Sequence, residues 1–279
     1  MRRLIINADD FGLTLGVNRA IAEAHERGIL TSTTLMACGK RFDDAVNIVH
    51  QHPNLNVGCH VVLVDGSPTG LAPSLTNKSG KAFRESILNF ARNAVVGQLD
   101  ASEIQAEIAA QIRKLQAAGI RVSHLDSHKH THIFPVVLNG MLRAAENCGV
   151  RAIRNPFEPL VFALTRHWKR QFQLRILSHY RSRFREAIAR SGVVTTDGCI
   201  GILATGGLTT NTFSELIKNL PEGTWEFVSH PGYNDAELYG VKTRLRHSRE
   251  MELQILTDFS VKELLKVEQI QLISYRDLA

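Results

Sequence analysis

The feature that most constrains this chain is a recurrence of short polar clusters, each placed directly after an apolar, strand-like stretch. The clusters occupy residues 7–10, 58–60, 126–132 and 229–232. In a barrel of alternating strands and helices, the carboxyl ends of all strands lie on one face. The pattern therefore predicts that carboxylates and imidazoles far apart in the chain converge on one site that combines a metal with a base.

Length and composition fit a water-soluble α/β protein. The chain has 279 residues and is 44% hydrophobic, enough to bury the core of one α/β barrel or of two smaller domains. The first residues hold too few consecutive apolar side chains for a secretion signal, which needs roughly 7–15. No run approaches the ~18 apolar residues of a membrane span. We therefore expect a cytoplasmic protein.

Strand-like and helix-like segments alternate almost throughout. Strands are predicted at residues 4–6, 33–36, 56–63, 122–125, 151–154, 193–196, 201–204, 225–229 and 271–274. Helices are predicted at 18–27, 42–50, 84–93, 102–118, 135–145, 212–220 and 245–258. This alternation is typical of a parallel α/β architecture, and a TIM-like (β/α) barrel suits the length. With no internal repeat and no linker, residues 1–279 are expected to form a single domain.

A basic insertion interrupts the alternation at about residues 157–190. Eight lysines and arginines lie between Arg166 and Arg190, opposed only by Glu186. Apolar and aromatic residues are interleaved with them, which suits peripheral contact with an anionic membrane surface. The alternative is a helical hairpin packed on the barrel with a solvated basic face. A non-catalytic binder of lipid or nucleic acid is a further alternative, but no nucleic-acid motif is present, so we expect no nucleic-acid partner.

The adjacent acids Asp9 and Asp10 are the first candidates for site chemistry. Neighbouring side chains of an extended chain point to opposite sides, so both can enter one pocket only if the chain turns there. Gly12 would permit that turn. One acid would then bind a metal while the other removes a proton from water. The alternative is a helix N-cap before Asn18 or a solvated turn.

Asp126, His128, His130 and His132 are spaced by two residues. On an extended chain they would share one face, so one metal could contact several of them. The spacing does not select which imidazole binds the metal, and the others would orient neighbours or protonate substrate.

His60 and His230 carry less information when each is taken alone. A metal held by three ligands needs a donor from another strand, which His60 would supply. His230 precedes Pro231 and Gly232, and a turn is an alternative explanation for that cluster. One carboxylate and two imidazoles would leave open positions on a divalent ion, as a hydrolytic site requires.

Taken together, the motifs resemble those of the YdjC-type carbohydrate deacetylases, also called the chitooligosaccharide deacetylase family. The matching segments are NADDFG at 7–12, GILTSTT at 28–34, GCH at 58–60, LDSHKHTH at 125–132 and HPG at 230–232. The resemblance implies an irregular (β/α) barrel that removes an N-acetyl group from an amino sugar. It also implies one divalent metal ion as cofactor, with Zn²⁺ or Mg²⁺ expected.

Roles follow from the positions of the matching residues. The resemblance assigns the metal to Asp10, His60 and His128. It makes Asp9 the general base and a protonated His230 the general acid. It places the remaining residues in a supporting or substrate-contacting shell: Asp126, His130, His132 and Arg154.

Within the family, the chain most resembles the branch associated with hopanoid biosynthesis. That branch implies an acetylglucosaminyl hopanoid lipid as substrate and a location peripheral to the inner membrane, and a homodimer is compatible with it. The alternative within the family is a chitobiose-type oligosaccharide. A metal-dependent phosphoesterase is the alternative of another class, although it would usually need more ligands for two metals and a basic clamp on phosphate.

Overall fold

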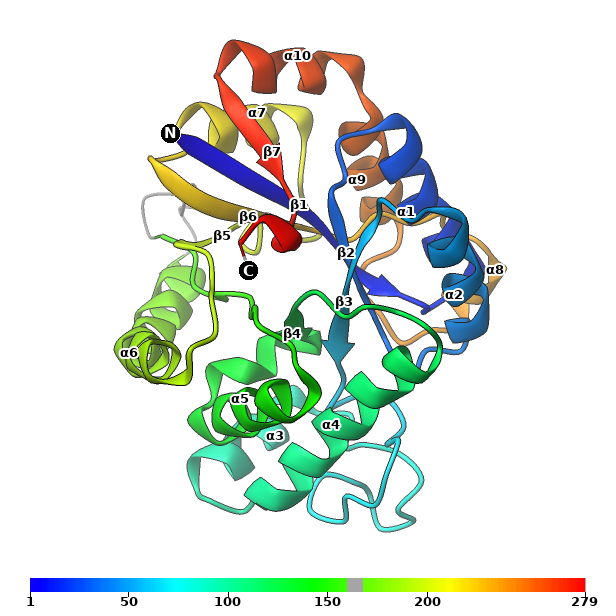
Figure 1. Cartoon of the computed structure of the whole chain (residues 1–279), viewed down its shortest axis with the longest axis vertical. Helices are drawn as coiled ribbons and strands as arrows, with labels where there is room; N and C mark the ends of the chain where they lie inside the picture. The colour runs from blue at the N-terminus through cyan, green and yellow to red at the C-terminus, as the bar shows by residue number, and fades with distance from the viewer. Residues whose placement is uncertain (160–167, 279) are drawn as a thin grey trace.

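A parallel, seven-stranded sheet forms the centre of the molecule (Figure 1). The computed structural model describes residues 1–159 and 168–278, with side chains described outside 160–179. The strands are β1 (Arg2–Phe11), β2 (Ser32–Leu35), β3 (Asn56–Val61), β4 (Leu125–Ser127), β5 (Gly198–Ile200), β6 (Gly223–Ser229) and β7 (Ile270–Ile273). Their order is β4-β3-β2-β1-β6-β5, and β7 pairs with the first half of β1.

The sheet curls into a half-barrel, which confirms the predicted α/β barrel-like fold in a single domain. Isolated parallel bridges continue it beyond β4, from Leu125 to Ile153 and from Ala152 to Val194. Val194 leads directly toward β5, so single bridges span the gap between the two edges of the sheet. The carboxyl ends of the strands therefore face one common opening.

Helices cover the outer face of the curled sheet (Figure 1). They are α1 (Leu15–Arg27), α2 (Phe42–Gln51), α3 (Ile87–Val95), α4 (Ala101–Ala117), α5 (Pro135–Cys148), α6 (Trp168–Ser191), α7 (Thr210–Lys218), α8 (Ala236–Tyr239), α9 (His247–Thr257) and α10 (Phe259–Val267). Two 3₁₀ turns, η1 (His128–Ile133) and η3 (Tyr275–Asp277), complete the secondary structure of the described residues.

Local sequence signals explain where several helices begin and end. Thr14 caps α1 by accepting the N–H of Val17, and Asp100 caps α4 by accepting two backbone N–H groups. Pro135 opens α5, and Gly149 ends it in a left-handed conformation. Among the described residues, no helix combines the length and the apolar content needed to span a bilayer.

Some predicted boundaries are wrong. The strand predicted at 122–125 is β4 at Leu125–Ser127, and the segments 151–154 and 193–196 contribute only single bridges. Residues 201–204 form a turn, because Gly201 has φ +94° and the Glu158 carboxylate accepts the N–H groups of Gly201 and Leu203. In the insertion, α6 is helical as expected, while residues 160–167 lie outside the described part.

The two faces of the curled sheet differ in chemistry. In β1, Leu4, Ile6 and Ala8 pack into the main apolar core on the helix side. The alternate residues point inward, and Asn7 and Asp9 are among them. Further buried polar residues belong to the same inner layer: Thr34, His60, Asp126 and Glu226. The barrel interior is therefore a polar network, while apolar burial outside it supplies the main hydrophobic stabilisation.

Gly58 makes room for an aromatic stack at the floor of this interior. The His124 ring stacks on Tyr275 with 3.6 Å between ring centroids. A Cβ on Gly58 would lie 2.5 Å from the His124 ring and 2.7 Å from its carbonyl oxygen. Only glycine lets β3 approach His124 this closely.

We therefore expect Gly58→Ala to lower the free energy of unfolding by about 1–3 kcal/mol, the usual cost of overpacking. Urea unfolding followed by circular dichroism measures the change. Gly207→Ala is the control, because its Cβ would meet only the Ala204 carbonyl oxygen, at 3.9 Å. Equal stability of the two variants would contradict the close approach of Gly58 to His124.

Candidate metal centre

A β-bulge brings both adjacent acids into one site. Ala8 pairs with Thr33 and Phe11 with Leu35, so Asp9 and Asp10 together oppose the single residue Thr34. Asp10 has φ +66°, a left-handed conformation that is unusual for an aspartate. The turn needed to bring both carboxylates to one side therefore occurs at Asp10 itself, before Gly12.

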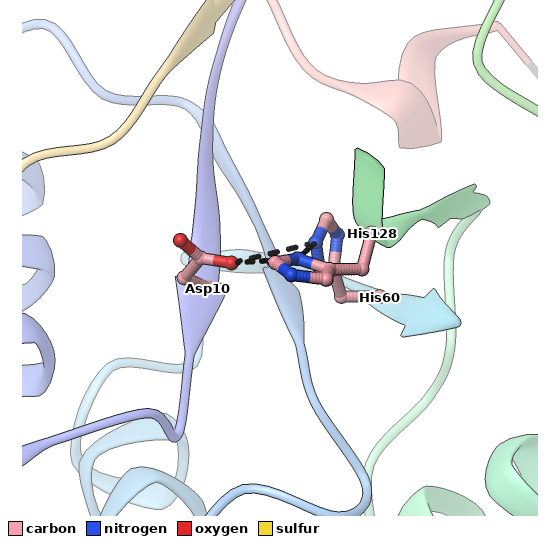
Figure 2. A group of neighbouring side chains, drawn as sticks. All are labelled: Asp10, His60 and His128. Atoms are coloured by element: carbon pink, nitrogen blue, oxygen red, sulfur yellow. Dashed lines mark hydrogen bonds and ion pairs between the residues drawn. The ribbon is translucent and has the colours of Figure 1, made fainter. Parts of the chain in front are cut away.

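Three side chains from three strand ends meet at the opening of the barrel, as Figure 2 shows. Asp10 Oδ1 lies 3.3 Å from His128 Nδ1 and 3.6 Å from His60 Nε2. The two imidazole nitrogens are 3.3 Å apart. The sequence therefore brings together the three residues that the resemblance assigns to the metal.

The spacing of these three atoms fits a metal ion. Three ligand atoms about 2.0–2.2 Å from one ion, at tetrahedral angles, lie roughly 3.3–3.6 Å apart. Asp10 Oδ1 is buried and has no hydrogen-bond partner, whereas Oδ2 is bound by Arg249 Nη2 at 2.5 Å. Arg249 thus orients the carboxylate and leaves one oxygen aimed at the imidazoles.

Asp126 supports His60 from behind. Its Oδ1 lies 2.8 Å from His60 Nδ1, which leaves Nε2 directed toward Asp10 and His128. Burial lowers the pKa of His60, but the charge and hydrogen bond of Asp126 outweigh this and raise it to about 9. An environment that stabilises positive charge on His60 also suits a cation at Nε2.

His128 reaches the site through a turn and not through an extended strand. Residues His128–Ile133 form η1, and Lys129 and His130 have left-handed backbone angles of φ 55° and 53°. The prediction that Asp126, His128, His130 and His132 share one face of an extended chain is therefore wrong. The turn directs only His128 to Asp10 and His60.

The other two histidines of this segment lie beside the centre. His130 lines the active-site cavity, and its Nδ1 is buried without a hydrogen-bond partner. Burial, followed by the charge of Arg154, lowers the pKa of His130 to about 3, so its ring is neutral. His132 is fully buried, and its Nδ1 lies 2.5 Å from the Ser127 hydroxyl. His132 therefore braces the turn that carries His128.

Arg154 binds the neighbouring acid, Asp9, from below. Its two terminal nitrogens contact Asp9 Oδ2 at 2.8 Å and Oδ1 at 2.6 Å. It also contacts Asp126 at 2.7 Å and Glu226 at 2.7 Å, and it is fully buried. Asp9, His60 and Asp126 form a second close group of metal-type donors, but the guanidinium already neutralises both of its carboxylates. Arg154 is thus an internal counter-ion beneath the cavity and is not among the residues that line it.

These contacts set the charge of Asp9. Burial raises the pKa of its carboxyl, but the charge and hydrogen bonds of Arg154 outweigh burial and hold the pKa well below its usual range. Asp9 is therefore an ionised carboxylate beside the three donor atoms. Its oxygens face Arg154 and, at 3.9 Å, His230 Nε2.

His230 follows β6 and enters the site from the side opposite His128. Gly232 is required there, because its Cβ would lie 2.9 Å from the Arg249 side chain and 3.1 Å from Val17. The HPG segment therefore serves both the turn and the close passage of Arg249 to Asp10. Burial lowers the pKa of His230 to about 4, so the ring is neutral at neutral pH and not protonated as expected.

The donor atoms open into a cavity of about 660 Å³. Asp9, Asp10, His60, His128 and His230 line its base. The loops after β2 and β3 and the segment after α8 form its rim. Its basic side chains are Lys40, Lys129 of η1, Lys242 and Arg244. Its volume lies within the ~300–1,000 Å³ of small-molecule sites.

Comparison with known proteins identifies the family of this chain. The YdjC-like protein family matches residues 3–267. The chain belongs to the YdjC-like family. It is 34% identical to a carbohydrate deacetylase of Brevibacillus brevis and 32% identical to one of Geobacillus stearothermophilus, covering 99% of this chain in both cases and 99% and 98% of those proteins.

A solved structure shares the whole fold. It is a protein of Enterococcus faecalis named for cellobiose-phosphate cleavage, 28% identical to this chain with a TM-score of 0.80. The match covers 100% of this chain and 99% of the other. The YdjC-like barrel is therefore shared along the entire length.

Sequence reasoning missed several residues that support this YdjC-like site. They are Thr34, Glu226, Arg249, Glu252 and Tyr275. Arg249 and Glu252 carried a signal, because they share the buried face of α9 with Leu253 and Leu256. Charged residues on an apolar helical face point to a buried partner. Thr34, Glu226 and Tyr275 have no comparable local signal.

Removing Arg154 should destabilise the YdjC-like fold strongly. Arg154→Met leaves three carboxylates buried without their counter-ion, which costs about 3–5 kcal/mol of unfolding free energy. Arg27→Met is the control, because Arg27 is exposed and pairs only with Glu23 on the same helix. Urea unfolding at pH 7 distinguishes the two variants.

The loss of unfolding free energy in Arg154→Met should shrink at acidic pH, because the stabilisation from ionised Asp9 is lost as pH falls. A deficit below 1 kcal/mol would contradict the counter-ion role.

Removing His128 should remove metal binding while the fold persists. His128 is only partly buried, so His128→Ala should unfold like the parent protein. Isothermal titration with Zn²⁺ should show stoichiometric binding in the parent and in His247→Ala, whose histidine is 80% exposed, but not in His128→Ala. Undiminished Zn²⁺ binding by His128→Ala would transfer the ligand role to His130.

Proposed function

We propose that this chain is a metal-dependent deacetylase that hydrolyses the N-acetyl group of an amino sugar. The observation that carries the proposal is the convergence of Asp10, His60 and His128 on one point, with the unligated carboxylate of Asp9 beside it. The relatives named carbohydrate deacetylases, which align over nearly the whole chain, support the same reaction.

The metal would be bound by Asp10, His60 and His128. A divalent ion there supplies Lewis acidity to a water molecule and to the acetyl carbonyl oxygen. Near-tetrahedral donor spacing supports Zn²⁺, whereas Mg²⁺ prefers octahedral oxygen ligands. Zn²⁺ is therefore favoured over Mg²⁺, the other ion expected from the sequence.

The protein side chains would move the protons. Asp9, held ionised and fixed in place by Arg154, would accept the proton of the attacking water. His230 Nε2 would donate a proton to the departing nitrogen, because an amine anion is too poor a leaving group. His230 starts neutral, so its donor is the imidazole N–H and not an imidazolium. His130, neutral and unpaired at Nδ1, is placed to contact substrate in the cavity.

A lipid-linked substrate, such as an acetylglucosaminyl hopanoid, is the specific form of this proposal. Arg183, Arg185 and Arg190 are exposed on α6. Leu88 and Val95 of α3 are 79% and 65% exposed. Ring contacts from Phe90 through Phe134 to Tyr180 connect the two helices. Exposed apolar side chains beside arginines suit the surface of an anionic membrane.

One observation favours a phosphoester instead. The basic side chains at the cavity rim, Lys40, Lys129, Lys242 and Arg244, would suit a phosphate group. However, three donor atoms around one point fall short of the two-metal site common in phosphoester hydrolysis. A phosphoesterase therefore remains the second candidate.

The decisive experiment compares substrates by mass spectrometry with Zn²⁺-loaded protein. N-acetylglucosaminyl lipid in anionic vesicles, chitobiose and a phosphomonoester are each incubated with the enzyme. Loss of one acetyl mass from the lipid alone supports the lipid-linked form, and loss from chitobiose supports an oligosaccharide. Phosphate release without acetate release would overturn the deacetylase.

Asp9→Asn should lower the rate of acetate release by roughly 10²–10⁴-fold, the usual contribution of a general base. Bound Zn²⁺ should stay at the parent level, because Asp9 is not among the three donors. The matched control is Asp43→Asn, an exposed carboxylate in the first turn of α2. Parental turnover in Asp9→Asn would exclude Asp9 as the base. Vesicle binding that survives without any turnover in the parent would favour the non-catalytic binder.

A further inference from the structure

His230 and Glu252 form a buried pair that the proposed chemistry leaves incomplete. Glu252 Oε2 accepts the backbone N–H of His230 at 2.5 Å and lies 3.9 Å from the ring Nδ1. Both His230 Nδ1 and Glu252 Oε1 are buried without a hydrogen-bond partner. An unpaired buried ring nitrogen 3.9 Å from a buried carboxylate indicates that the two groups act on each other.

The opposite edge of the ring fixes its tautomer. His230 Nε2 lies 3.9 Å from Asp9 Oδ2, and the Asp9 carboxylate can only accept hydrogen bonds while Arg154 keeps it ionised. Nε2 is therefore the nitrogen that bears hydrogen in the neutral ring. Nδ1 is left as an acceptor, and it faces Glu252.

Burial of both groups favours the proton of the pair on Glu252. Burial raises the pKa of Glu252 to about 7, against the lowering effects of the His230 backbone N–H and Arg249. Burial lowers the pKa of His230 to about 4. The charged groups that face the pair lie on α9, β1 and β3: Arg249, Asp9, Asp10 and His60. Near neutral pH, a protonated Glu252 thus faces a neutral imidazole.

We propose that Glu252 is a positioning residue that orients His230 and passes a proton through its ring to the departing nitrogen. The step deepens the proposed deacetylase function and rests on it. As the C–N bond breaks, the Nε2–H bond of His230 breaks and an N–H bond forms on the amine. The Glu252 O–H bond breaks in turn, and an N–H bond forms at Nδ1. Asp9 then returns the water proton to Nε2 while Nδ1 gives its proton back to Glu252, which closes the cycle.

Kinetics of Glu252→Gln test the relay. Glutamine keeps an oxygen for the His230 N–H but cannot transfer a proton. With Zn²⁺-loaded enzyme and an N-acetylglucosamine substrate, kcat should fall roughly 10²-fold while KM changes little. In the parent, kcat should also fall as pH rises through the pKa of Glu252, because only protonated Glu252 donates. This fall in kcat at high pH should be absent in Glu252→Gln. It should be unchanged in Glu250→Gln, a more exposed glutamate of the same helix. If Glu252→Gln keeps the parental kcat and the same fall in kcat with rising pH, the proposed proton transfer from Glu252 is wrong.

A measurement without turnover separates this inference from the proposed function. In nitrogen-15 NMR of the full chain loaded with Zn²⁺, the His230 Nδ1 resonance should shift with pH as Glu252 loses its proton. The same transition should occur in Glu250→Gln and disappear in Glu252→Gln. If the transition persists in Glu252→Gln, or is absent in the parent, Glu252 does not exchange a proton with His230, and this conclusion holds for any substrate. A transition without acetate release supports the pair and rejects the deacetylase.

Discussion

The contact on which the rest of the structure depends is that of the Arg154 guanidinium with three carboxylates. Asp9, Asp126 and Glu226 come from β1, β4 and β6, and Arg154 from the bridging segment that helps close the barrel. Any of these carboxylates buried alone would cost several kcal/mol. One fully buried planar cation with paired nitrogens satisfies all three. The closure of the barrel and the ionisation of Asp9 thus depend on the same side chain.

Two arginines give the adjacent acids different roles. Arg154 engages both oxygens of Asp9, so Asp9 stays ionised, with its Oδ2 3.9 Å from His230 Nε2. Arg249 engages only Oδ2 of Asp10, which leaves Oδ1 unpaired and 3.3 Å from His128. Identical side chains at neighbouring positions are therefore held differently: both oxygens of Asp9 are paired with Arg154, whereas one oxygen of Asp10 has no partner.

The strand-end position of the site was predictable from sequence, but its internal geometry was not. Polar clusters after apolar strands predicted that these segments converge, because parallel strands end on one face, and the family resemblance singled out Asp10, His60 and His128. The bulge at Asp9 and Asp10 was hidden, because nothing local marks an aspartate that adopts φ +66°. The turn at His128 was also hidden, since alternation by two is the pattern of a strand and overrode the possibility of η1. Residues 151–154 were predicted as a strand but pair only by single bridges, because sequence alone does not distinguish a continuous ladder from isolated pairing.

Strained backbone conformations are concentrated at the candidate metal centre. Asp10, Lys129 and His130 all hold left-handed conformations, each costing on the order of 1 kcal/mol or more for a residue other than glycine. Such conformations persist where surrounding contacts over-determine them. For Asp10 the contacts are the β1 ladder and Arg249, and for the turn they are the Ser127–His132 hydrogen bonds and the Lys129–Asp65 ion pair. The apolar layer outside the barrel supplies the main hydrophobic stabilisation. The inner polar layer can therefore hold Asp10 and the turn that carries His128 in strained conformations, with their donor atoms already oriented toward one point.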